Sequence, residues 1–174
     1  VLACQPVALL AWLRDNEPEN YRNIRWVFEC KDYVRFRLTG EAFAEVTDYS
    51  GTNLMNLHTR DYDPRLLGLF GLEAAGGALP PLRLSTDVCG RITEEAAALT
   101  GLKAGTPVVG GMFDIDACAV AADITTPEEL VTIAGTWSIN EFISDHPIMD
   151  GNISRNSLFA IPGYYLAEES SACL

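Results

Sequence analysis

Asp114 is the residue whose neighbours most suggest chemistry. It follows an expected buried strand at 106–109 and a Gly110-Gly111 turn, and it precedes a run of small and apolar residues typical of a tightly packed helix. A carboxylate at a helix N-terminus can act simply as a cap, and that role would explain the residue type. The helix dipole also favours the ionised form, which could accept a proton from a substrate hydroxyl. The spacing leaves both interpretations open.

Gly135-Thr136 is the second candidate, because it lies between expected strands at 130–133 and 139–143. An ordinary hairpin turn explains this pattern. In a functional interpretation, the backbone N–H groups and the Thr136 hydroxyl face a transferring phosphate. Trp137 is more typical of packing than of ligand contact. Neither pattern identifies a function on its own.

No metal site is predicted from protein ligands alone. Asp114 and Asp116 are two residues apart, and side chains with that spacing point in different directions on a helix. We expect Asp116 to decorate the first turn. His58 and His146 have no neighbouring ligands and are expected at the surface. The sequence contains no P-loop, GxSxG or HExxH motif.

Several local signals predict the elements that must position these residues. The connector at 123–129 (DITTPEE) is polar and contains a proline, which favours an irregular segment. The other expected elements each have a periodic apolar pattern or a boundary residue. They are a helix at 6–16, a short strand at 26–28, a helix at 31–38 ended by Gly40, a helix opened by Asp63-Pro64, a helix between Thr93 and Gly101, and a helix at 115–122.

Composition excludes some classes of partner. The net charge of −12 provides no basic patch for a nucleic acid or an anionic membrane. The five cysteines are scattered and odd in number, as expected for reduced thiols in a cytoplasmic protein. The apolar runs are too short to span a membrane, and no signal-peptide pattern opens the chain.

Five segments, taken in order, are similar to the FGGY-type carbohydrate kinases. The segments are 27–40 (VFECKDYVRFRLTG), 47–50 (TDYS), 53–54 (NL), 110–114 (GGMFD) and 135–137 (GTW). The fourth resembles the catalytic-aspartate segment of the family, and the fifth resembles its phosphate-binding turn. Within the family, GGMFD followed by GTW resembles the L-xylulose kinases most closely.

This resemblance implies an α/β fold of the actin-like, ribonuclease-H-like class, with ATP and Mg²⁺ bound between two domains. It implies that Asp114 binds the sugar hydroxyl and acts as the catalytic base. It also implies that Gly135 and Thr136 hold the ATP phosphates and that Tyr49 contacts the sugar. The expected reaction is ATP-dependent phosphorylation of a sugar hydroxyl, in a ketopentose such as L-xylulose.

The same resemblance predicts that the chain is the middle portion of a longer kinase. Residues 1–122 then form the end of the N-terminal, sugar-binding domain, 123–129 the interdomain connector, and 130–174 the start of the ATP-binding domain. The chain begins in mid-pattern without an initiator Met, and we expect the isolated chain to be inactive. The resemblance leaves a homodimer open. A non-catalytic sugar- or nucleotide-sensing domain on the same fold, or an inactive kinase fragment, is the alternative.

Overall fold

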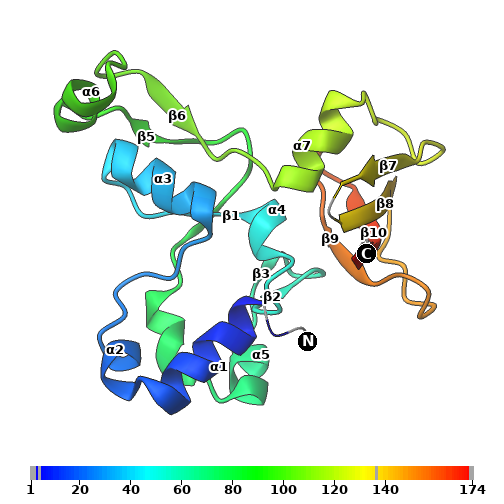
Figure 1. Ribbon diagram of the computed structural model, residues 1–174, viewed down its shortest axis with the longest axis horizontal. Helices are drawn as coiled ribbons and strands as arrows, with labels where there is room; N and C mark the ends of the chain where they lie inside the picture. Colours follow the sequence, from blue (N-terminus) through cyan, green and yellow to red (C-terminus); the bar gives the residue numbers. More distant parts are fainter. Residues whose placement is uncertain (1–2, 4, 136, 173–174) are drawn as a thin grey trace. The chain divides into compact units, whose positions relative to one another are not determined.

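The computed structural model describes residues 3, 5–135 and 137–172 of the chain (Figure 1). Its contacts divide into two compact units, Val1–Gly111 and Met112–Leu174. Each unit is described separately below. No helix in the described part of the chain is long and apolar enough to cross a membrane.

The first unit is mainly helical and contains three small sheets, one parallel (β1–β4) and two antiparallel (β2–β3 and β5–β6). Its core includes buried apolar side chains from separate elements, among them Val7, Tyr49 and Leu54. The elements are α1 (Pro6–Asn16), α2 (Pro18–Arg22), α3 (Cys30–Thr39), β1 (Ala44–Glu45), α4 (Val46–Tyr49), β2 (Met55–Asn56), β3 (Asp61–Tyr62), α5 (Pro64–Phe70), η1 (Glu73–Ala78), β4 (Leu82–Arg83), β5 (Val88–Arg91), α6 (Glu94–Thr100) and β6 (Pro107–Val109).

The boundary residues of these helices act as the sequence predicts. Helix α3 ends at Gly40, whose φ of 75° is the left-handed conformation that glycine adopts without strain. The Asp63 carboxylate caps α5 by accepting a hydrogen bond from the Arg65 N–H. The Thr93 hydroxyl caps α6 by accepting from the Ala96 N–H. The predicted helix at 6–16 is also confirmed as α1.

Two expectations for this unit are wrong. Residues 26–28 form no strand; the Val27 N–H instead donates to the carbonyl oxygen of Ala78, which belongs to the short helix η1. Strand β6 lies where it was expected, but Pro107 and Val109 are exposed rather than buried. In the described part of the chain β6 pairs with β5 alone.

The second unit packs one helix, α7 (Asp114–Ala121), on an antiparallel sheet of order β7-β8-β10-β9. The strands are β7 (Val131–Ala134), β8 (Trp137–Ser144), β9 (Arg155–Leu158) and β10 (Tyr165–Ala172). Ile115 and Ala119 of α7 share a buried apolar cluster with Ile143 of β8 and Leu166 of β10. The helix therefore covers one face of the sheet (Figure 1).

The expected strand–turn–strand around Gly135 is confirmed, because β7 and β8 form an antiparallel hairpin. Residues 123–129 form an irregular connection between α7 and β7, as their composition predicts. They lie within the second compact unit. Their role as an interdomain connector stays a prediction.

Candidate functional site

Asp114 is the first residue of α7, and its side chain is exposed. The N-cap position belongs to Phe113, and the Asp114 carboxylate accepts a hydrogen bond from the Ile115 N–H at 2.8 Å through Oδ1. The free N–H groups at the start of the helix lie next to this carboxylate. The Asp114 carboxylate is therefore a solvent-accessible proton acceptor at the start of a helix.

Asp116 takes a different role, although it is only two residues further along the helix. Its side chain is fully buried, and Oδ1 accepts a hydrogen bond from the Ala160 N–H at 2.9 Å. Asp116 lies in the first turn of α7, as expected, and its side chain is buried whereas that of Asp114 is exposed. The prediction that the two carboxylates point in different directions is confirmed. Asp116 fastens α7 to the segment after β9.

The Gly135-Thr136 turn is described only in part, because Thr136 lies outside the described residues. Gly135 is exposed, and its N–H donates to the Trp137 carbonyl oxygen at 3.1 Å. Trp137 is half exposed. The phosphate-binding role of Gly135 and Thr136 stays a prediction.

A row of charged side chains crosses the same sheet and was not predicted from the sequence. Glu141 of β8 pairs in register with Glu168 of β10, and Glu168 pairs with Arg155 of β9. The Arg155 guanidinium forms an ion pair with Glu168 and lies 4.8 Å from the ring centre of Phe113. Phe113 immediately precedes Asp114, so this row contacts the segment that carries the predicted base.

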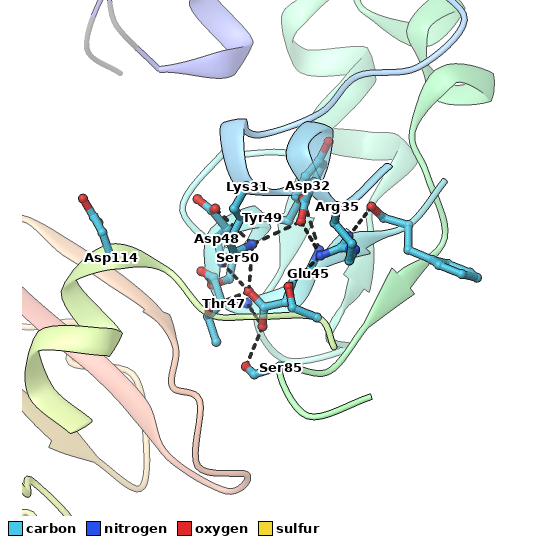
Figure 2. A network of polar contacts seen from close by, with 12 residues as sticks. Lys31, Asp32, Arg35, Glu45, Thr47, Asp48, Tyr49, Ser50, Ser85 and Asp114 are labelled. Carbon is cyan, nitrogen blue, oxygen red and sulfur yellow. Dashed lines mark hydrogen bonds and ion pairs between the residues drawn. The ribbon is translucent and has the colours of Figure 1, made fainter. Parts of the chain in front are cut away.

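The first unit contains a buried network of charges centred on Lys31 (Figure 2). The ammonium of Lys31 lies 3.2 Å from Asp32, 3.2 Å from Glu45 and 3.1 Å from Asp48. Burial opposes the charge of Lys31, but Asp48, Glu45 and Asp32 together raise its pKa. The three carboxylates therefore hold the lysine in its charged form.

Arg35 and Glu45 extend this network to the backbone and to a second strand. Arg35 forms an ion pair of 2.8 Å with Asp32 and donates to the Gly110 carbonyl oxygen at 2.6 Å. Glu45 caps α4 and also accepts from the Ser85 hydroxyl at 2.7 Å. Figure 2 shows these side chains converging from α3, β1, α4 and the segment after β4.

Tyr49, the predicted sugar contact, is buried in the first unit. The residue is 1% exposed, its hydroxyl donates to the Val27 carbonyl oxygen, and Tyr62 packs edge-on against its ring. Its role in sugar binding stays a prediction, and its surroundings favour a structural role.

The two histidines lie at the surface, as predicted. Among the described residues, no group of three or more His, Cys, Asp or Glu side chains could hold a metal ion. Mg²⁺ commonly binds through substrate phosphates and water with few protein ligands.

Residues 1–121 match the model of the FGGY family of carbohydrate kinases, N-terminal domain. The chain belongs to this FGGY family. It is 43% identical over 141 residues to a probable L-xylulose kinase of Pasteurella multocida, covering 81% of this chain and 29% of the relative. It is 40% identical over 163 residues to an L-xylulose/3-keto-L-gulonate kinase of Escherichia coli, covering 90% of this chain and 33% of the relative.

A solved FGGY structure, the xylulose kinase from Rhodospirillum rubrum, superposes with a TM-score of 0.88 at 28% identity. The match covers 99% of this chain and 35% of that protein. The predicted actin-like, ribonuclease-H-like α/β fold is thereby confirmed, and this FGGY chain spans about a third of the length of the relatives it matches.

Proposed function

We propose that the chain is part of an ATP-dependent kinase that phosphorylates a hydroxyl of a ketopentose such as L-xylulose. The observation that carries this proposal is the exposed Asp114 carboxylate at the start of α7, within a segment that resembles the family's catalytic aspartate. Two relatives are named as L-xylulose kinases, one of them acting also on 3-keto-L-gulonate. These names motivate the choice of sugar.

In the proposed reaction, Asp114 accepts the proton of the sugar hydroxyl while the sugar oxygen forms a bond to the γ-phosphorus of ATP. The bond between that phosphorus and the bridging oxygen of ADP breaks, and ADP leaves. The N–H groups at the Gly135-Thr136 turn and the Thr136 hydroxyl would stabilise the transferring phosphate. Bound Mg²⁺ would neutralise charge on the phosphate oxygens.

A coupled assay for ADP release by the full-length protein, with ketopentoses, polyols and aldonates, tests this proposal. The expected result is sugar-dependent ADP release that is fastest with a ketopentose. ATP or sugar binding without ADP release would overturn it and favour the non-catalytic sensing domain. The isolated 174-residue chain serves as a second sample and is expected to release no ADP, because one turn supplies only some of the phosphate contacts.

A further inference from the structure

Glu141 is a buried acid with no visible partner. Glu141 is 1% exposed, and among the described residues neither of its carboxyl oxygens has a hydrogen-bond partner. An ionised carboxylate in such a place is costly, because it loses its hydration and gains nothing in return. A neutral acid in the same place loses far less.

The strand register explains why Glu141 lacks a cation. Glu141 stands between Val131 of β7 and Glu168 of β10, and Glu168 stands beside Arg155 of β9. Cross-strand neighbours project from the same face of a sheet. The Arg155 guanidinium already pairs with Glu168 and packs on the ring of Phe113. One guanidinium therefore serves two carboxylates, and Glu168 has the direct contact.

The elements packed around Glu141 contribute two negative groups and one positive group. Glu168 on β10 and Asp114 on α7 are negative, Arg155 on β9 is positive, and Val131 on β7 is apolar. Burial first, then Glu168 and Asp114, raise the pKa of Glu141 to about 7 against the opposing effect of Arg155. The row from Glu141 through Glu168 to Arg155 reaches Phe113, the residue before Asp114, and so connects this buried acid to the segment that carries the predicted base.

We propose that Glu141 is a positioning residue for Asp114: it holds a proton in the working protein, so that Arg155 stays paired with Glu168 and packed on Phe113, the residue before Asp114. The inference rests on the proposed kinase function. An ionised Glu141 would compete with Glu168 for Arg155 and would so disturb the contact of the guanidinium with Phe113. An added buried negative charge would also repel the phosphate oxygens of ATP. Loss of the Glu141 proton should therefore slow turnover.

The test compares Glu141→Gln with wild type in the full-length protein, because glutamine has the shape of the neutral acid and cannot ionise. Turnover is measured with saturating ATP and ketopentose between pH 6 and pH 8.5. The ratio of variant to wild-type kcat should rise by about tenfold across this range, the effect of ~1.4 kcal/mol of charge interaction. Glu169→Gln is the matched control, since Glu169 neighbours Glu168 on β10 and is exposed; its ratio should stay flat.

A ratio of variant to wild-type kcat that stays within about twofold across the pH range would overturn the proposal, because the expected change in this ratio is about tenfold. Infrared spectroscopy of protein carrying ¹³C-labelled glutamate gives a readout that does not depend on activity or on a Glu141 variant. Because the pKa of Glu29 is also raised to about 7, the spectra are recorded on Glu29→Gln. A protonated carboxyl band at pH 6 that disappears by pH 8.5 is expected in that variant, and its absence at pH 6 would contradict the proton on Glu141. If wild type releases no sugar-dependent ADP, the proposed kinase function fails, while the infrared measurement still decides the protonation of Glu141.

Discussion

Arg35 joins helix α3 to the segment that leads into α7, through a hydrogen bond of 2.6 Å from its Nη1 to the carbonyl oxygen of Gly110. The side chain is 3% exposed, and it also donates to the Phe43 carbonyl oxygen and pairs with Asp32. A planar guanidinium can serve three acceptors at fixed angles, which an ammonium on a flexible stem cannot do. We infer that Arg35 fixes the backbone four residues before Asp114.

Replacing Arg35 by Met should therefore destabilise the protein by about 3–5 kcal/mol, the usual cost of removing one partner of a buried ion pair. Urea unfolding of the full-length protein measures this change. Arg37→Met is the control, because Arg37 lies on the same helix and is exposed. Equal unfolding midpoints for the two variants would show that the Gly110 contact contributes no stability.

Asp114 and Asp116 should give opposite results when each is replaced. Asp114→Asn keeps the shape of an exposed side chain, so stability should change by less than about 1 kcal/mol, the usual value of a charge at a helix N-terminus. The kcat should fall by about 10²–10⁴-fold, the usual contribution of a general base. Asp116→Ala leaves the Ala160 N–H without its acceptor, which should cost about 1–3 kcal/mol of stability. Steady-state kinetics and urea unfolding of both variants test this pair. Turnover of Asp114→Asn within a few-fold of wild type would remove Asp114 from the mechanism.

Glu29 should make stability depend on pH in the first unit. Burial, Asp48 and Asp32 raise its pKa to about 7 from the ordinary 4.5, against the opposing effect of Lys31. Between these two values the folded protein binds more protons than the unfolded protein, so the contribution of Glu29 to stability falls as pH rises from 4.5 to about 7. Above that window the loss is complete.

Glu29→Gln cannot ionise, so the melting temperature of this variant minus that of wild type should increase from pH 4.5 to pH 7 and then level off. Thermal unfolding monitored at several pH values measures the difference. Glu41→Gln, at an exposed position in the same unit, should follow wild type throughout. A Glu29→Gln difference that is constant with pH would mean that the pKa of Glu29 is the same in the folded and unfolded protein.

Local signals predicted the helix boundaries because each boundary depends on residues within one turn. Asp63, Thr93 and Gly40 act through contacts to their immediate neighbours in the chain, and their roles are confirmed. The prediction of a strand at 26–28 was wrong because it depends on a contact with a distant part of the chain. Strand formation needs a partner from elsewhere, and Val27 meets the short helix η1 instead.

The same distinction between local signals and long-range contacts applies to the candidate site. The sequence placed Asp114 at the start of a helix, because a strand, a glycine turn and an apolar run are all local patterns. It did not reveal the row formed by Glu141, Glu168 and Arg155, since strand register joins residues from three separate strands. The local signal that could have drawn attention to Glu141 is its place between Ile139 and Ile143 at alternate positions of the strand, which puts an acid on an apolar face.

The Gly135-Thr136 turn offers a test of phosphate binding that can be separated from folding. The backbone of Gly135 lies outside the left-handed region, and a Cβ added there would come no closer than 3.6 Å to the Trp137 carbonyl oxygen. Alanine should therefore fit the folded turn without strain. If the turn approaches the ATP phosphates, the added methyl group should hinder them, because glycine permits the closest approach of backbone to ligand.

Gly135→Ala in the full-length protein should accordingly raise the KM for ATP while leaving the sugar KM and the melting temperature close to wild type. Thr136→Ala should weaken ATP use by about 1–3 kcal/mol, the value of a hydrogen bond to a charged group. Gly77→Ala is the matched control, because a Cβ at Gly77 meets nothing within 4 Å and the first unit carries no predicted phosphate turn. Steady-state kinetics with each substrate varied in turn distinguish the outcomes. An increase in the sugar KM alone would mean that this turn faces the sugar, and unchanged kinetics for both variants would exclude the turn from the ATP site.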